Sequence, residues 1–329
     1  MVEHRMADTA SHDDGGKAAV YAALFANLGI AVTKFIAAAF SGSSAMLAEG
    51  IHSTVDTANE GFLLLGMSRG KKPADAQHPF GYAGEVFFWS FIVAVLIFAL
   101  GAGLSIYEGV RAILHGGHEA DGVPWIPFAV LGVSFCFEGY SLSVAIREFM
   151  KLRAGRGLIR DLRDMKDPAI FVVLAEDSAA CLGLIIAAIG VGLSWYLANP
   201  LFDAGASIVI GVVLGITAVT LAIEVKGLLI GESAAPEMTD RIHEMVRSIP
   251  EIKHINEIRS LHLGPHQVLL TLSIDFADDV LSQRIEAIVT DLDHDIRETF
   301  AIVNSVFLEV QSRDGHRRII AETPDIVSA

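Results

Sequence analysis

The sequence is poor in cysteine and in positive charge. Its 2 cysteines, Cys136 and Cys181, both lie within apolar runs, so we expect packing residues and no disulfide framework. Lysine and arginine together number 24, against 39 aspartates and glutamates, which gives a formal net charge of -15. So acidic a chain is a poor partner for nucleic acid, and its carboxylates attract cations instead.

The first residues, MVEHRMADTASHDDGG, also lack two features. They have no apolar core of the kind found in signal peptides, and they are too acidic for an organelle presequence. We therefore expect residues 1–16 to form a disordered cytoplasmic tail, and the protein to lie in a prokaryotic cell (inner) membrane.

Apolar residues, by contrast, are abundant. They make up 52% of the chain, and the mean hydropathy of +0.50 is typical of an integral membrane protein. The sequence predicts six membrane-spanning helices within a transmembrane domain at 17–232, at residues 18–40, 45–66, 86–114, 124–149, 169–197 and 201–229. Lys34, near the far end of the first span, is expected to reach the membrane surface.

The connecting segments differ in charge. Lysine and arginine occur in the segments 68–72 and 147–166, whereas 41–43, 115–123 and 198–200 contain none. The positive-inside rule therefore places both termini in the cytoplasm.

Residues 233–312 have the composition of a soluble domain. Their periodicity predicts a helix at 238–248, strands at 255–263 and 267–276, a helix at 282–299 and a strand at 305–310. The expected fold is thus an α-helical membrane protein with six transmembrane helices and a C-terminal cytoplasmic α/β domain of ferredoxin-like type. Residues 313–329 are expected to be a disordered tail.

The second span carries polar residues at helical spacing. Glu49, His52, Asp56 and Asn59 fall on one face, and Glu60 adjoins them. His52 and Asp56 meet over one turn and offer a nitrogen and an oxygen to a common point. That donor pair suits zinc, iron, cobalt or nickel better than calcium or magnesium. The alternative is that the two side chains simply hydrogen-bond to each other or to a neighbouring helix.

The fifth span carries Glu176 and Asp177. From the rise per residue, Asp177 and Asp56 lie roughly 12 and 16 Å from the cytoplasmic ends of their helices, at similar depth. Two carboxylates and a histidine that converge in lipid repel one another unless a cation or protons neutralise them. Metal binding would resolve that conflict.

Several of these features together resemble one family. The segment GSSAMLAEGIHSTVDTANE, the loop PADAQHPFGY, six spans and an α/β tail are similar to the cation diffusion facilitator family of metal transporters. The resemblance implies a homodimer, joined through its transmembrane and C-terminal domains, that exports a divalent metal, usually zinc, in exchange for protons. It implies a tetrahedral site with His52, Asp56 and Asp177 as ligands, and a second, interfacial zinc site that includes Asp75 and His78.

The chain departs from the family pattern within the membrane and in the loop. Val173 stands where many members have a histidine, so the fourth ligand is open between Glu176, which points about 100° away from Asp177, and water. Tyr82 stands where the loop site would have another histidine. Gly84 occupies a place where relatives often carry a basic residue, which puts a charged interlock of the dimer in doubt.

The soluble domain also departs from the pattern. A dinuclear metal site is not expected there, because the positions of metal ligands in some members are occupied by Asn256, Ser273, Glu309 and Gln311. His262 and His266 flank the predicted hairpin. They could bind metal independently, but we expect them to be exposed and solvated.

Three further membrane residues have two interpretations each. Cys181 lies one turn beyond Asp177 and is a soft ligand or, as we prefer, a packing residue. Glu138 pairs with another helix or relays protons, and we favour the structural role. Asp203 lines an exit vestibule or caps its own helix.

Two rival functions remain open at this point. One is a membrane-embedded metalloenzyme, but no HEXXH or nucleophile motif accompanies the site, so we expect no enzyme. The other is a metal sensor or ion channel gated by the soluble domain. No cofactor is expected, and Zn²⁺ is the preferred substrate, although iron, cobalt and manganese suit the same donors.

Overall fold

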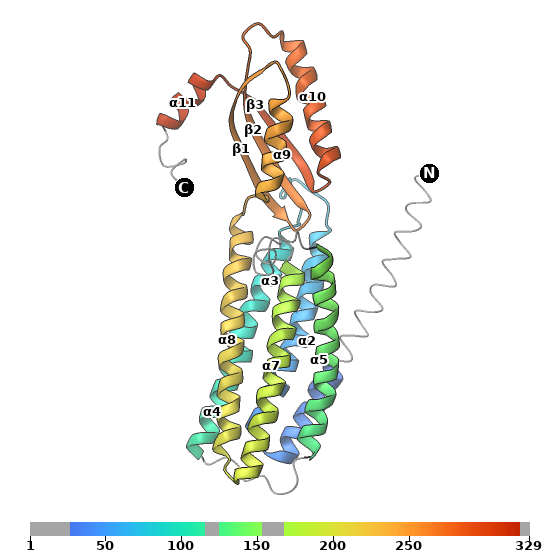
Figure 1. The fold of residues 1–329 in the computed structure, drawn as a ribbon, viewed down its shortest axis with the longest axis vertical. Helices are drawn as coiled ribbons and strands as arrows, with labels where there is room; N and C mark the ends of the chain where they lie inside the picture. Colours follow the sequence, from blue (N-terminus) through green and yellow to red (C-terminus); the bar gives the residue numbers. More distant parts are fainter. Residues whose placement is uncertain (1–26, 116–124, 153–167, 323–329) are drawn as a thin grey trace, which may run out of the picture. The chain divides into compact units, whose positions relative to one another are not determined.

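The computed structural model describes residues 27–115, 125–152 and 168–322, which form two compact units (Figure 1). The first unit contains the described residues up to Ser68 and those within Val86–Lys226. The second contains Arg69–Glu85 and the described residues from Gly227 onward. The connection between the second and third predicted spans thus groups with the C-terminal domain.

The first unit is helical. Its elements are a helix at Asn27–Ser41, α2 (Ser44–Gly70), α3 (Glu85–Leu96), the π-helical segment η1 (Ile97–Ala102), α4 (Gly103–His115), α5 (Trp125–Leu152), α7 (Pro168–Leu197) and α8 (Leu201–Ile230). Within the described residues, four stretches are long and apolar enough to cross a membrane: Glu85–His115, Trp125–Arg147, Ile170–Leu197 and Leu201–Ile230. The expected multi-pass helical architecture is therefore confirmed.

The first two predicted spans are not both long and apolar enough, in the described residues, to be counted with these four. The described helix Asn27–Ser41 is apolar but short, and residues 18–26 of the predicted span lie outside the described part. Helix α2 has 27 residues but carries several acidic side chains. Both share the apolar core of the first unit, to which they contribute Ala37, Met46 and Val55. The count of six spans stays a prediction.

Small residues let the helices of the first unit approach closely. At Gly109 of α4, a Cβ atom would lie 2.6 Å from Ile208 Cγ1 and 2.7 Å from the Ala204 carbonyl oxygen, both on α8. Real Cβ atoms do not approach other atoms that closely, so only glycine allows this contact between α4 and α8.

The second unit contains the expected α/β domain. Helices α9 (Pro236–Arg247) and α10 (Ser282–Thr299) cover one face of a sheet made of β1 (Ile252–Gly264), β2 (Gln267–Phe276) and β3 (Val303–Val310). The strand order is β1-β2-β3, antiparallel between β1 and β2 and parallel between β2 and β3. Alternate residues of β2, including Leu270, Leu272 and Ile274, point into the core. The ferredoxin-like prediction is confirmed.

The C-terminal end differs from the expected disordered tail. Residues Arg313–Glu322 form helix α11, and 323–329 lie outside the described part. Ser312 begins the helix by accepting a hydrogen bond from the Gly315 N–H through its Oγ, at 3.2 Å. Asp275 of β2 accepts another from the Arg313 N–H at 3.1 Å. The local cap and the tertiary contact with β2, neither of which follows from apolar periodicity, hold a segment with no buried residue of its own.

Candidate metal site

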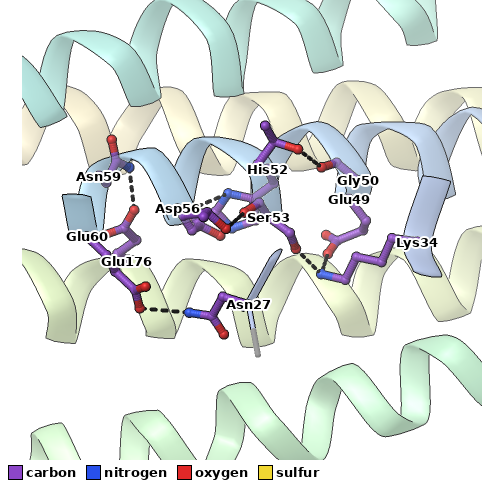
Figure 2. Close-up of polar contacts among 12 residues, drawn as sticks. Asn27, Lys34, Glu49, Gly50, His52, Ser53, Asp56, Asn59, Glu60 and Glu176 are labelled. Atoms are coloured by element: carbon purple, nitrogen blue, oxygen red, sulfur yellow. Dashed lines mark hydrogen bonds and ion pairs between the residues drawn. The ribbon is translucent and has the colours of Figure 1, made fainter. Parts of the chain in front are cut away.

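Helix α2 places the predicted ligands on its buried face. His52 is 1% exposed, and its Nδ1 atom lies 3.2 Å from Asp56 Oδ1, one helical turn away (Figure 2). The sequence spacing therefore does bring the imidazole and the carboxylate together.

The donor atoms of this pair make no hydrogen bonds to any described residue. Within the described residues, both ring nitrogens of His52 and both carboxylate oxygens of Asp56 are buried without a hydrogen-bond partner. Leaving one buried polar group unpaired costs about 1–3 kcal/mol. An adjacent set of such atoms fits a cation that binds through their lone pairs.

The fifth predicted span, α7, directs its two acids to different neighbours. Glu176 is 7% exposed, and its Oε1 atom accepts a hydrogen bond from Asn59 Nδ2 of α2 at 2.5 Å (Figure 2). The Glu176 carboxyl group is also close enough to that of Asp56 for the two to interact electrostatically. Two buried carboxylates that interact in this way repel each other unless a proton or a cation neutralises them. The acid on α7 that adjoins the His52 pair is thus Glu176.

Asp177 points toward α5 instead. Its Oδ2 atom accepts a hydrogen bond from Ser141 Oγ at 2.7 Å. Successive residues of a helix point about 100° apart, so the rotation of α7 that directs Glu176 toward α2 turns Asp177 away. In the described part of the chain, no group of three or more His, Cys, Asp or Glu side chains is arranged to hold one metal ion.

Three further polar residues of the helical unit, Glu138, Cys181 and Asp203, lie in different surroundings. Glu138 of α5 is partly buried and within electrostatic range of His52 and Asp177. Cys181 is buried in α7. Asp203 caps the start of α2 rather than its own helix, because its Oδ2 atom accepts a hydrogen bond from the Ser44 N–H at 2.6 Å.

The prediction for Lys34 was wrong. Its side chain is fully buried, and its Nζ atom lies 3.0 Å from Glu49 Oε2 and 2.7 Å from Ser53 Oγ, instead of reaching the membrane surface. The position of Lys34 within its own helix does not reveal this contact. A buried acid at Glu49 on the adjacent helix was the available signal for an ion pair.

The predicted loop site is built from hydrogen bonds. Asp75 Oδ1 accepts from the backbone N–H groups of Gln77 and His78, at 2.9 and 2.8 Å, and Oδ2 accepts from the Tyr82 hydroxyl at 2.7 Å. The Tyr82 bond, followed by that from His78, lowers the pKa of Asp75 to about 2. His78 Nδ1 is 3.5 Å from Asp75 Oδ1. A metal bound by Asp75 would have to displace these donors.

The C-terminal residues that occupy ligand positions in the family pattern make contacts of their own. Asn256 Nδ2 donates to the Gln311 carbonyl at 2.8 Å and contacts Ser273 Oγ at 3.3 Å. Ser273, Glu309 and Gln311 line a cavity of about 430 Å³ beside α11. His266 is exposed as expected, but the expectation was wrong for His262, which is 5% exposed, because it lies in strand β1 where the hairpin is packed.

Known proteins resemble this chain over most of its length. The family described as "Cation efflux transmembrane domain" matches residues 20–230. The proton-coupled zinc antiporter SLC30A9, mitochondrial, of Mus musculus is 35% identical over 252 residues, which are 76% of this chain and 44% of that protein. Metal tolerance protein C4 of Arabidopsis thaliana is 34% identical over 274 residues, which are 83% of this chain and 60% of that protein.

A bacterial relative matches over more of its length. Magnetosome protein MamB of Magnetospira sp. is 25% identical over 287 residues, which are 84% of this chain and 90% of that protein. The chain spans less than half the length of the SLC30A9 relative. The family match covers more than half of the chain, and it coincides with the helical unit that contains the unpaired His52 and Asp56 donors. This chain belongs to the cation diffusion facilitator family, whose members are membrane transporters of metal ions and not enzymes.

Proposed function

We propose that this protein exports a divalent transition metal, and specifically Zn²⁺, from the cytoplasm in exchange for protons. One observation carries the proposal. His52 and Asp56, buried in the helical unit of a cation efflux protein, have donor atoms that make no hydrogen bond within the described residues. The name of the mouse relative, a proton-coupled zinc antiporter, supports the choice of zinc and of protons.

We assign the metal to His52, Asp56 and Glu176, with Asp177 or water as the fourth ligand. Because no three such side chains are arranged to hold one ion in the described residues, His52, Asp56 and Glu176 would have to close around the metal when it binds. A nitrogen and several carboxylate oxygens form a donor set that zinc accepts. Because Asp177 contacts Ser141 in the conformation seen here, its participation requires a rotation of α7 relative to α2. Such a rotation fits a transport cycle in which helices rock to expose one site alternately to each side of the membrane.

Protons and metal would compete for the same atoms. An imidazole exchanges its proton in the physiological pH range, and metal binding requires its neutral form and ionised carboxylates. Protons arriving from the outer side would therefore weaken the site and release the metal outward. No cofactor takes part in this scheme.

The same proposal includes the assembly and the location. We infer a homodimer in the cell membrane with both termini in the cytoplasm, based on the positive-inside rule and the family pattern. The mouse relative is named mitochondrial, so the choice of a prokaryotic cell membrane rests on the sequence of this chain alone. Crosslinking in native membranes tests the dimer, and labelling of single introduced cysteines from each side tests the orientation.

Transport in proteoliposomes tests the function directly. Purified full-length protein is reconstituted with a zinc-sensitive dye and a pH-sensitive dye, and a zinc gradient is imposed. We expect saturable zinc movement with opposite proton movement, loss of both in Asp56→Ala, and a loss of at least about tenfold in Glu176→Gln. Glu60→Gln is the matched control, because Glu60 pairs with Asn27 at 2.7 Å.

Each alternative gives a different result. Zinc movement without counter-moving protons would contradict the exchange and favour a channel. Absence of saturable movement in the wild type would contradict transport altogether. A larger loss in Asp177→Asn than in Glu176→Gln would reverse the assignment of the α7 ligand.

A further inference from the structure

A charged pair outside the proposed ligand set lies close to it. Lys34, in the helix Asn27–Ser41, and Glu49 of α2 are both 0% exposed, and Lys34 Nζ is 3.0 Å from Glu49 Oε2. Lys34 also donates to Ser53 Oγ at 2.7 Å. An isolated buried ammonium or carboxylate is strongly unfavourable, so each of these charges depends on the other.

The pair adjoins the proposed metal site. Glu49 precedes His52 by one turn on the buried face of α2, and Ser53 directly follows His52. Figure 2 shows Lys34 extending to Glu49 and Ser53, next to His52 and Asp56 along the same helix. Lys34 is also within electrostatic range of both His52 and Asp56.

Only one of the two carboxylate oxygens of Glu49 is used in the pair with Lys34. Its Oε1 atom is buried and makes no hydrogen bond within the described residues, and it faces α7, where a Cβ atom at Gly183 would lie 2.5 Å from it. The carboxylate thus sits between α2 and α7, the two helices that carry the proposed ligands. Without Lys34, Glu49 would add one more unneutralised carboxylate beside Asp56 and Glu176, in a region where Glu138 and Asp177 also lie.

The charge balance of the site follows from these contacts. Asp56 and Glu176 together carry two negative charges when ionised, which match one divalent ion. We propose that Lys34 is a positioning residue that holds Glu49 as a neutral ion pair outside the coordination shell, so that the site is matched to a single divalent metal and can release it. This inference rests on the proposed metal transport.

A purely structural pair predicts something different. Replacing a buried ion pair by apolar or neutral residues is often harmless to folding, whereas removing one partner leaves an uncompensated charge. If the pair sets the charge of the metal site, removing Lys34 and removing Glu49 change the affinity for metal in opposite directions. Opposite changes in affinity therefore distinguish this role from a purely structural one.

The test uses Lys34→Met, Glu49→Gln and the double variant in zinc-transport assays on the full chain. Lys34→Met frees a carboxylate beside the site, so we expect a KM for zinc lowered about tenfold and a lower maximal rate, since the metal is held longer. Glu49→Gln leaves a positive charge there, so we expect a KM raised about tenfold. The double variant should return toward the wild-type KM.

Two controls complete the design. Lys34→Arg keeps the charge and should stay near the wild type. Ser207→Ala removes a different buried contact of the first unit, the hydrogen bond to the Ser105 carbonyl at 2.8 Å, and should not shift KM. If Lys34→Met does not fold, the rise in KM for Glu49→Gln and its recovery in the double variant still decide the matter.

Failure of the role of Lys34 and failure of the proposed transport give different results. KM shifts of the same sign in both single variants, no shift in either, or no recovery in the double variant would overturn the role of Lys34. Zinc binding by equilibrium dialysis gives the same comparison without transport. A wild-type protein that binds zinc but does not move it would refute the proposed transport and leave the role of Lys34 to be judged by binding.

Discussion

Asp203 offers a quantitative test of how α2 is held in place. It belongs to α8, is 8% exposed, and accepts hydrogen bonds from the start of α2. Its Oδ1 atom accepts from Ser43 Oγ at 2.6 Å, and its Oδ2 atom accepts from the Ser44 N–H at 2.6 Å, Ser44 Oγ at 2.9 Å and the Ala45 N–H at 3.3 Å. One carboxylate therefore caps the helix that carries His52 and Asp56.

The expected losses follow from these contacts. Removing a helix cap costs about 1–2 kcal/mol, and removing a negative charge from a partly buried helix N-terminus costs about 1–2 kcal/mol more. Asp203→Ala should therefore reduce the free energy of unfolding by roughly 3 kcal/mol. Asp203→Asn keeps an acceptor oxygen for the backbone N–H groups and loses mainly the charge, about 1 kcal/mol.

Thermal unfolding of the purified protein in detergent measures the difference. At a few degrees per kcal/mol for a chain of this size, the Tm should fall by roughly 5–10 °C in Asp203→Ala and about 2–4 °C in Asp203→Asn. Glu244→Ala is the control, because it removes an acid whose contact is an exposed surface pair with Arg241 at 2.9 Å. Equal Tm values for Asp203→Ala and the wild type, or equal losses in both Asp203 variants, would refute the capping argument.

Three further outcomes are expected. Gly109→Ala should force α4 away from α8, lower the free energy of unfolding by about 1–3 kcal/mol and so lower the Tm. Gly132→Ala, with no atom within 4 Å of its Cβ position, should be neutral or stabilise the protein by up to about 1 kcal/mol. Equal Tm values for the two variants would contradict the close packing of α4 and α8. Tyr82→Phe should raise the pKa of Asp75 from about 2 toward its ordinary value of 3.8, as followed by NMR of the carboxyl carbon. Because folding lowers that pKa, the contribution of Asp75 to loop stability is present above pH 3.8 and is lost as the pH falls toward 2. If Asp75 titrates at the same pH in Tyr82→Phe as in the wild type, the Tyr82 hydrogen bond is not formed. Ile242→Ala, at a fully buried position of the C-terminal core, should cost about 3 kcal/mol and speed hydrogen exchange in β2, and unchanged exchange would count against that core.

Periodicity predicted most of the elements because it is a property of each segment alone. The apolar stretches from 86 to 229 were located to within a few residues of Glu85–His115, Trp125–Leu152, Pro168–Leu197 and Leu201–Ile230. Strand β2 and helix α10 begin and end where the alternation of their residues predicted. The segment after Ser312 was misjudged because contacts with β2 and the Ser312 cap, rather than its own apolar pattern, hold α11.

In the candidate site, too, contacts within one helix could be predicted from the sequence and contacts between helices could not. The His52 and Asp56 pair could be predicted because both residues lie on one helix, four positions apart. The choice between Glu176 and Asp177 could not, since it depends on how far α7 is rotated about its axis against α2 and α5. The sequence also placed Tyr82 where a histidine was expected, without revealing that its hydroxyl binds the Asp75 carboxylate.

By itself, the sequence determined the membrane class, the α/β character of the C-terminal domain and the polar face of α2, because each follows from local spacing and composition. Only the tertiary structure decided that Lys34 pairs with Glu49 and that Asp203 caps α2. Both contacts join residues on different helices. A buried charge or a free helix end takes whichever partner packing brings within reach, and the order of residues along one helix does not specify that partner.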